Sequence, residues 1–364
     1  MCIAAFHKTY AKFREIATMK AIVKTGFGEK QLELQEVPMP LCGDNEVLIK
    51  VKAMGICNSD LRIFLGEQMT NVPIILGQEF SGEIVEIGYK TQKFKAGDRV
   101  TSRFSPHACN SCSNCLRRDY HLCLYKRSPG ILSNGAFAEY VSLPEAILYI
   151  IPDNVSYESA TLMEPAATVA YGILERVKID PEEVVVIIGP GVIGLLALQM
   201  ARFSGAKKIV MIGQNQDKEK RLPLAIDLGA DLAISSSDND IRSSILSFSG
   251  GRGVDLLVDC VGSAEVVTLG IDLLRMYGRY CALGQLLSED ICIPWKKIIT
   301  HNLSLEFVDS ATPLSSSIIY SLFERGVINT DKLITEICNL EEYESLFLKM
   351  AKGEIIKAVM TNND

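Results

Sequence analysis

The feature that most constrains this 364-residue chain is an uncharged run, residues 184–201, that a glycine-rich turn interrupts. The run is about as long as a membrane span, yet Gly189-Pro190-Gly191 in its middle would break a helix exposed to lipid. A buried strand, a tight turn and a buried helix explain the run better. We therefore expect a strand–turn–helix unit here and no membrane anchor.

The turn has the pattern Gly189-x-Gly191-x-x-Gly194 directly after the apolar strand residues. In such a unit the first glycine permits the tight turn, the second lets the backbone approach a pyrophosphate, and the third lets the helix pack close to the sheet. The free N–H groups at the helix N-terminus then face the phosphates. Glycine turns are common, but the position of this one between strand and helix predicts dinucleotide binding.

The end of the next expected strand, residues 208–212, should distinguish NAD from NADP. A carboxylate there binds the ribose 2′-OH of NAD, whereas a cation suits the 2′-phosphate of NADP. Asp217 is near this position, but Lys218 and Arg221 could reach a phosphate, so both cofactors stay open. The residues expected to bind the cofactor are Gly189, Gly191, Val192, Ile193, Gly194, Gly213, Lys218, Arg221, Val261 and Gly284.

The pattern of strands and turns changes along the chain. Before about residue 151, short β-type runs such as 47–52 and 84–87 lie between Gly, Pro and Asp residues, which indicates an irregular β-barrel or sandwich. From residue 184 onward, expected strands alternate with helices, which implies a parallel sheet covered on both faces. We expect an N-terminal extension at 1–18, a first domain at 19–151 and 297–364, and a dinucleotide-binding domain at 152–296.

Composition excludes several classes of protein. With 48% hydrophobic residues the chain is not disordered, and a formal charge of −7 without a basic block argues against nucleic-acid and anionic-membrane partners. Eleven cysteines are too few for a disulfide scaffold of this length. Lys8, Lys12 and Arg14 interrupt any apolar core in residues 1–18, so we expect no signal peptide and a reducing, cytoplasmic setting.

Four of the cysteines lie in one loop with the spacing Cys109-x2-Cys112-x2-Cys115-x7-Cys123. This spacing can close a tetrahedron around Zn²⁺, and four thiolates leave no open coordination position, so such a zinc is structural. An iron–sulfur cluster is the main alternative. The polar loop and the absence of a proline after Cys123 favour zinc.

Further motifs accompany the cysteine loop and the glycine-rich turn: Gly55-Ile-Cys57-Asn-Ser59-Asp60, Gly77-Gln78-Glu79-Phe-Ser-Gly82 with Gly88, Phe94-x2-Gly97-Asp98-Arg99-Val100, Gly135-Ala-Phe137-Ala138-Glu139-Tyr140, and Glu164-Pro165. With them, nearly the whole chain from Met19 resembles the zinc-containing medium-chain alcohol and polyol dehydrogenases, in particular the sorbitol, threonine and sugar-phosphate branches. The resemblance implies an α/β chain in which a GroES-like irregular β-barrel catalytic domain accompanies a Rossmann doubly wound parallel sheet.

The resemblance also implies a second, catalytic zinc, with Cys57, position 78, Glu79 and Glu164 as its ligands. Position 78 is Gln where the family has His. Gln is also neutral, but an amide oxygen is a poor zinc ligand. Because Cys57, Asp60, Glu79 and Glu164 are all retained, we expect a working but weakened or altered metal site.

The family's proton path is kept only in part. Ser59 retains the first hydroxyl of the relay, but Arg62 occupies the place of a later His, and a guanidinium cannot relay a proton. Proton release is therefore expected to go straight to solvent. Lys357 is expected either to hold the cofactor phosphates or to be a solvated surface lysine.

Together these features predict the reversible NAD- or NADP-dependent oxidation of a secondary alcohol to a ketone, with zinc as the Lewis acid. By resemblance the substrate is a polyol, a sugar alcohol or an amino alcohol such as threonine, and the enzyme is a homo-oligomer, a tetramer. The expected catalytic residues are Cys57, Ser59, Asp60, Glu79 and Glu164. Two alternatives stay open: a zinc-independent NADPH carbonyl or enone reductase, and a non-catalytic dinucleotide-binding regulator.

Overall fold

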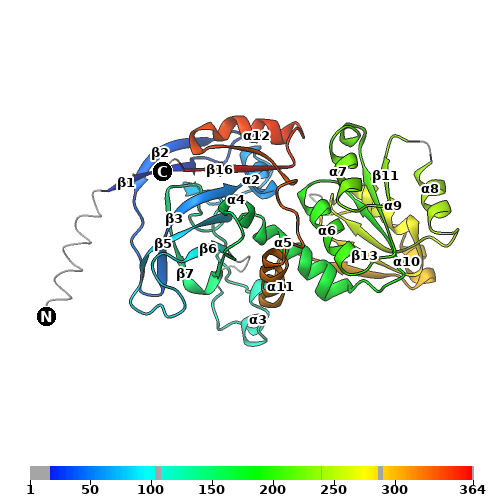
Figure 1. Ribbon diagram of the computed structural model, residues 1–364, viewed down its shortest axis with the longest axis horizontal. Coiled ribbons are helices and arrows are strands. Elements are labelled where there is room, and N and C mark those ends of the chain that lie inside the picture. Colours follow the sequence, from blue (N-terminus) through cyan, green and yellow to red (C-terminus); the bar gives the residue numbers. More distant parts are fainter. Residues whose placement is uncertain (1–16, 103–107, 239, 286–289, 363–364) are drawn as a thin grey trace. The chain divides into compact units, whose positions relative to one another are not determined.

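The computed structural model describes residues 17–102, 108–238, 240–285 and 290–362 (Figure 1). The chain divides into two compact units, one made of Met1–Glu164 and Ile334–Asp364 and the other of Pro165–Leu333. The expected extension at 1–18 lies outside the described residues except for its last two, and the first strand begins at Thr18.

The first unit is built from two sheets, with strand orders β2-β1-β4 and β15-β16-β3-β5-β6-β8, and β7 pairs with β3. Their bounds are β1 Thr18–Lys24, β2 Leu32–Pro38, β3 Glu46–Gly55, β4 Ile74–Ile75, β5 Glu79–Ile87, β6 Arg99–Ser102, β7 Tyr140–Pro144, β8 Leu148–Ile150, β15 Ile334–Asn339 and β16 Lys357–Thr361. The helices are α2 Asn58–Phe64, α3 Ser113–Leu116, α4 Tyr157–Ala160 and α12 Tyr343–Ala351, and α5 Met163–Ala170 begins in this unit.

Strand β3 is the centre of this unit, because it pairs antiparallel with β5, β7 and β16. Alternate side chains of β3, Val47, Ile49 and Val51, are fully buried in one hydrophobic core with Phe80 and Phe137. These three side chains share one face of the strand, because alternate residues of a strand point to the same side. The last residue of β3 pairs with Glu79 of β5 and Val359 of β16, so three strands meet where α2 begins.

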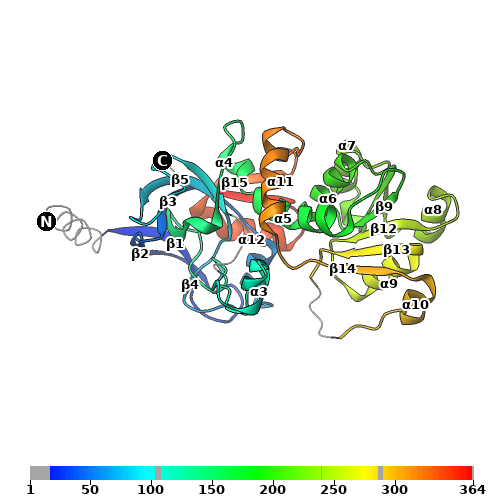
Figure 2. The same ribbon diagram turned by 90° about the horizontal axis from the view of Figure 1, so that it is seen from below.

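The second unit is a six-stranded parallel sheet with the order β11-β10-β9-β12-β13-β14. Its strands are β9 Val184–Ile188, β10 Lys208–Gly213, β11 Leu232–Ser235, β12 Val254–Asp259, β13 Leu274–Ala282 and β14 Ser304–Phe307, and its helices are η3 Tyr171–Val177, α6 Val192–Phe203, α7 Arg221–Asp227, α8 Ile241–Phe248, α9 Ala264–Leu273, α10 Trp295–His301 and α11 Pro313–Glu324. Figure 2 shows α6 and α7 over one face of the sheet and α9 and α10 over the other. This strand order is that of a doubly wound dinucleotide-binding sheet, which confirms the expected α/β class.

The unit boundaries differ from those expected from the sequence. Residues 297–333 belong to the second unit, because β14 continues the parallel sheet beside β13, with Arg279 opposite Ser304. The first boundary also lies later than 151, because α4 packs on β3 and β5 and the Tyr157 carbonyl accepts a hydrogen bond from Ser81 Oγ at 2.6 Å. Each segment belongs to its unit because it contacts residues that are far away in the sequence.

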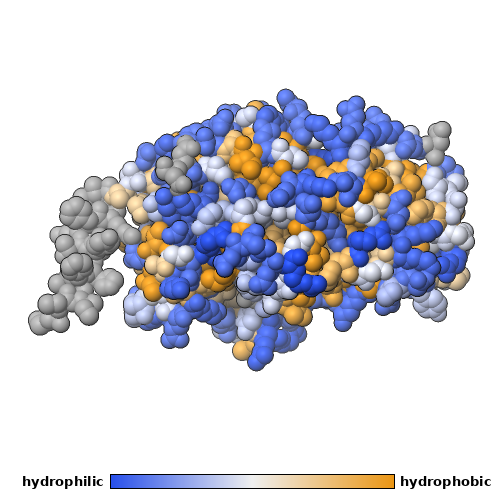
Figure 3. Space-filling view, in the orientation of Figure 1, coloured by the Kyte–Doolittle hydropathy of each residue, from blue (hydrophilic) through white to orange (hydrophobic). Residues whose placement is uncertain are grey.

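The uncharged run becomes strand β9, the turn at residues 189–191, and helix α6, as the glycine pattern predicts. Among the described residues, no helix is both long enough and apolar enough to cross a membrane. Figure 3 shows hydrophilic residues spread over the visible face, with hydrophobic residues scattered between them.

Candidate active site and metal centres

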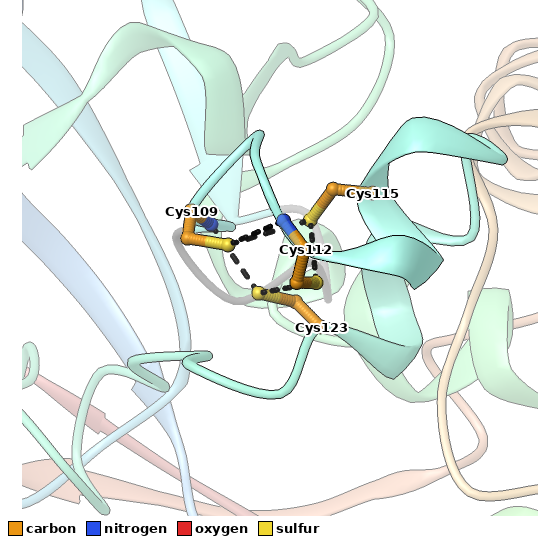
Figure 4. Close-up of side chains that lie close together, drawn as sticks. All are labelled: Cys109, Cys112, Cys115 and Cys123. Atoms are coloured by element: carbon orange, nitrogen blue, oxygen red, sulfur yellow. Dashed lines mark hydrogen bonds between the residues drawn. The ribbon is translucent and has the colours of Figure 1, made fainter.

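The four-cysteine loop brings its side chains to a common centre, as Figure 4 shows. The sulfur atoms of Cys112 and Cys115 lie 3.5 Å apart, those of Cys109 and Cys115 3.9 Å, and those of Cys112 and Cys123 4.0 Å. A regular tetrahedron with Zn–S bonds of about 2.3 Å has sulfur–sulfur edges of about 3.8 Å. The sulfurs are therefore spaced for one zinc ion, whereas an iron–sulfur cluster would hold them apart by its own atoms.

Backbone and hydroxyl groups around the loop favour the thiolate form that binds metal. The Cys109 sulfur accepts hydrogen bonds from the Cys112 N–H at 3.3 Å and from Ser111 Oγ at 3.4 Å. These hydrogen bonds, of which the one from Ser111 has the largest effect, lower the pKa of the Cys109 thiol to about 6. Burial raises the pKa of the Cys115 thiol to about 12, a cost that a bound cation offsets by stabilising the thiolate.

The residues expected at the catalytic zinc come from three elements of the first unit. Cys57 is the N-cap of α2, and its N–H donates to the Asp60 carboxylate at 2.9 Å, which fixes the first turn of the helix. Ser59 lies in the same turn, Gln78 directly precedes β5, and Glu79 is the first residue of that strand. Because β3 leads into α2 and pairs with β5, the sheet itself brings these residues together.

Gln78 joins the first two motifs directly. Its Nε2 donates to Cys57 Sγ at 3.3 Å and to Ser59 Oγ at 3.2 Å. Its backbone carbonyl accepts a hydrogen bond from Ser102 Oγ at 2.7 Å, which holds the residue in place. The side chain is 9% exposed, and its Oε1 is buried without a hydrogen-bond partner among the described residues. A buried carbonyl oxygen without a partner is costly unless something else binds it.

Glu79 forms a buried ion pair with Lys357, the first residue of β16, and the two side chains are 2% and 1% exposed. Lys357 Nζ also donates to the Ile56 carbonyl at 3.0 Å. The expectation of a solvated surface lysine is therefore wrong, because β16 pairs with β3 and places Lys357 inside the unit. Its Nζ is committed to Glu79, and nothing in these contacts connects it with cofactor phosphates.

The remaining acids raise one another's pKa values. Burial, and then the charges of Glu79, Asp60 and Glu164, raises the pKa of the Cys57 thiol, while Lys357 opposes this. Burial raises the pKa of Asp60 to about 7. Burial, and then the charge of Glu79, raises the pKa of Glu164, which lies in α5, well above its ordinary range. A cluster of this kind either holds protons or holds a cation that replaces them.

Within the described residues, the four loop cysteines are the group of three or more metal-ligating side chains whose ligand atoms lie within 4.8 Å of one another. The ligand atoms of Cys57, Glu79 and Glu164 therefore do not meet this distance limit, and Glu79 is paired with Lys357. The donor types still fit a zinc, because the set offers a thiol, carboxylates and a buried Gln78 oxygen that has no hydrogen-bond partner among the described residues.

The expected cofactor residues of the second unit lie at the carboxyl ends of its strands. Gly189 (φ +103°) follows β9, Gly191 is the N-cap of α6, and Val192, Ile193 and Gly194 open that helix. A Cβ at Gly194 would lie 1.9 Å from the Gly189 carbonyl oxygen, so only glycine allows this helix to start so close to the strand.

Three more of the predicted cofactor residues lie at the carboxyl ends of β10, β12 and β13. Gly213 ends β10, Val261 follows β12, and Gly284 follows β13. A Cβ at Gly284 would lie 2.5 Å from the Val261 backbone, and one at Gly189 would lie 2.7 Å from the Val261 side chain. Gly189, Val261 and Gly284 are thus brought together where the strand order reverses, the position at which doubly wound sheets bind dinucleotides.

Comparisons with known proteins agree with both units. The family described as alcohol dehydrogenase GroES-like domain matches residues 43–153, and that described as zinc-binding dehydrogenase matches residues 192–319. The chain is 33% identical over 347 residues to D-arabitol-phosphate dehydrogenase of Enterococcus avium, covering 95% of this chain and 98% of the relative. The chain belongs to the zinc-containing medium-chain alcohol and polyol dehydrogenases.

Other members of the medium-chain dehydrogenases extend this result. The sorbitol dehydrogenase of Halalkalibacterium halodurans is 35% identical, with 95% of this chain and 100% of the relative covered. A Sinorhizobium meliloti protein described as a zinc-binding dehydrogenase, solved bound to NADP, superposes with a TM-score of 0.88 at 28% identity, covering 95% of this chain and 99% of that one. As a member of this family the chain is an NAD(P)-linked alcohol dehydrogenase with a zinc site.

Sequence reasoning missed residues that support this dehydrogenase site. Lys357 lies 278 positions from Glu79, and no local pattern marks their pairing. Asp259 accepts hydrogen bonds from the N–H groups of Val261 and Gly262, which shapes the loop after β12. A signal for Asp259 existed, because an Asp at the start of a turn can hydrogen-bond the backbone two residues on, and Gly262 follows in the same loop.

Proposed function

We propose that this dehydrogenase oxidises a polyol, a sugar alcohol or an amino alcohol such as threonine to the corresponding ketone, reversibly, with NAD(P). The support is the shared substrate type of its relatives, which are named for arabitol phosphate, sorbitol and, at 31% identity in Bacillus velezensis, L-threonine. All three substrates carry a secondary hydroxyl beside a second polar group.

The proposed reaction site is the cluster of Cys57, Gln78 and Glu164, with Glu79 beside them. Zinc held there would polarise the substrate oxygen and lower the pKa of its hydroxyl. Cys57 and Glu164 would supply anionic ligands, and Gln78 would supply the oxygen that lacks a hydrogen-bond partner among the described residues. Lys357 forms an ion pair with Glu79, so in this proposal Glu79 orients neighbouring groups and is not itself a zinc ligand.

Ser59 receives the proton that the substrate loses. Its Oγ accepts the Gln78 Nε2–H at 3.2 Å, so the hydroxyl can use its second lone pair to accept the substrate's proton as it gives its own hydrogen to solvent. Arg62, on the same helix, stays charged and accepts no proton. In this proposal the proton passes from Ser59 to solvent and not along a histidine relay.

One observation carries the proposed zinc site: the buried Oε1 of Gln78 has no hydrogen-bond partner among the described residues, while the Nε2 of the same side chain donates to Cys57 Sγ. The test is an oxidation assay with sorbitol, a pentitol phosphate and threonine, comparing the parent with Cys57→Ala. The matched control is Cys292→Ala, which removes an exposed cysteine of the other unit. We expect Cys57→Ala to lose activity by two or more orders of magnitude while Cys292→Ala keeps it. Equal activity of the parent and Cys57→Ala contradicts the proposal.

A zinc-independent carbonyl or enone reductase is the second candidate, and one observation favours it. The Gln78 amide donates to Cys57 and Lys357 neutralises Glu79, so two of the site's groups have protein partners without a metal. Under this alternative, reduction of ketones or enones with NADPH persists in Cys57→Ala and in the presence of chelators. Loss of reduction in both conditions excludes the reductase.

We further propose a homotetramer in the cytoplasm. Strand β14 ends the sheet of the second unit, and its Phe307 is 67% exposed, so this edge offers unpaired backbone groups and apolar surface to a second copy. The zinc-binding thiols need a reducing compartment, which the cytoplasm provides. Sedimentation at micromolar concentration should show species larger than the 40.0 kDa chain, and a monomer alone contradicts the assembly.

A further inference from the structure

The carboxyl end of β10 carries no acid at the place where a dinucleotide's adenosine ribose is read. That place is Gly213, the last residue of the strand. A Cβ there would lie 2.9 Å from Pro190 Cγ and 3.0 Å from Asp217 Oδ2. A carboxylate at this position would therefore be crowded and would face a second negative charge.

Asp217, the acid that follows, is not available to a ribose either. It is 4% exposed, and its Oδ2 accepts the Gln214 N–H at 2.7 Å in a capping turn. Its Oδ1 lies 3.4 Å from Arg221 Nη1. The carboxylate that binds the 2′-OH of NAD in doubly wound sheets is thus absent from the end of this strand.

Instead, hydroxyl, amide and ammonium groups meet at the carboxyl ends of β10 and β11. Ser235 Oγ lies 2.9 Å from Ser237 Oγ, which donates to Asn215 Oδ1 at 3.1 Å. Lys218 Nζ lies 2.7 Å from Asp238 Oδ1, and Asp238 Oδ2 accepts the Ser235 N–H at 2.9 Å. The contacts place Lys218 beside the serine pair, on the same side as the turn after β10.

We propose that Lys218, Asn215 and Ser237 bind the 2′-phosphate of NADP(H), and that this chain prefers NADP over NAD. The proposal rests on the proposed function only in using the same dinucleotide site. A phosphate needs donors and a cation, and these side chains supply an ammonium, an amide N–H₂ and, when it turns from Asn215 Oδ1 to the ligand, the Ser237 hydroxyl. Lys218 is 43% exposed and has three N–H donors, so it can keep Asp238 and still donate to a phosphate.

The test measures binding without substrate, by titrating the purified protein with NADPH and NADH and following the nicotinamide fluorescence. NADPH should bind at least about 10-fold more tightly than NADH, and Lys218→Ala should weaken NADPH by about 10- to 100-fold while leaving NADH unchanged, the effect of losing one charge-assisted hydrogen bond. Lys220→Ala is the matched control, since Lys220 is an exposed lysine two residues away, and it should change neither affinity.

Competition with 2′,5′-ADP and 5′-AMP shows whether the phosphate itself is recognised, because the two compounds differ only there. The parent should bind 2′,5′-ADP more tightly, and Lys218→Ala should remove the difference. NADH binding as tight as NADPH binding, or a Lys218→Ala variant that weakens both cofactors equally or neither, overturns the proposal. If NADH binds as tightly as NADPH and supports alcohol oxidation, the NADP preference is wrong but the proposed dehydrogenase function stands. If NADPH binds tightly but no alcohol is oxidised, the NADP preference stands and the proposed function is wrong.

Discussion

Replacing Lys357 by Met should strongly destabilise the first unit, because it leaves the Glu79 carboxylate buried and unpaired. Both side chains are at most 2% exposed, and Lys357 Nζ also donates to the Ile56 carbonyl at 3.0 Å. Breaking a buried ion pair by removing one partner typically costs about 3–5 kcal/mol. Met has nearly the volume of Lys, so loss of packing contributes little to this figure.

The loss should depend on pH in a defined direction. Burial raises the pKa of Asp60 to about 7 and the charge of Lys357 opposes this, so in Lys357→Met the pKa of Asp60 in the folded state should rise further above its unfolded value. A group whose folded pKa is raised favours the folded state at low pH, and this contribution is lost as the pH rises through the folded pKa. The variant should therefore be less destabilised near pH 5 than near pH 8.

Urea unfolding followed by far-UV circular dichroism measures the effect. Lys352→Met is the matched control, because Lys352 is exposed at the end of α12 and surface changes of this kind stay within about 0.5 kcal/mol. The double variant Lys357→Met/Glu79→Gln should regain much of the lost stability, since it removes the buried charge as well. A loss below about 1 kcal/mol for Lys357→Met, or a double variant no more stable than the single one, refutes this reasoning.

Three further changes test the other sites. Cys112→Ser should release one zinc per subunit and lower the melting temperature, and metal analysis showing unchanged zinc contradicts the tetrahedral site. Gly191→Val should keep the circular dichroism spectrum, because a Cβ at this position meets no protein atom within 4 Å, but it should abolish dinucleotide binding by blocking the phosphates. Gly194→Ala should instead lower the melting temperature, because its Cβ would lie 1.9 Å from the Gly189 carbonyl oxygen. Gln78→His should retain more zinc during dialysis against a mild chelator, and equal retention counts against Gln78 as a ligand.

The parts of the fold that the sequence predicts well are those with local signals. The apolar run 184–188 ends sharply at Gly189, so strand β9 and helix α6 could be placed from the residues alone. The spacing of the four cysteines within one loop likewise determines their meeting, because a short loop allows few other arrangements.

Contacts between distant residues could not be predicted in this way. Strand β14 has only four residues, and its membership of the sheet depends on pairing with β13. For this reason the second unit ends at residue 333, whereas the sequence predicts an end at residue 296. The burial of Lys357 depends on β16 pairing with β3. Asp217 is an intermediate case, because Gln214 and Asp217 have the spacing of a capping turn and could have been interpreted as one.

Counting zinc ions per subunit tests the central claim most directly. Elemental analysis of the purified protein should give two zinc ions per chain, one for the four-cysteine loop and one for the cluster around Cys57 and Gln78. Cys57→Ala and Cys112→Ser should each retain one, and the double variant should retain none. One zinc in the parent, lost in Cys112→Ser and unaffected by Cys57→Ala, would contradict the catalytic zinc and leave a dehydrogenase fold with a structural zinc alone.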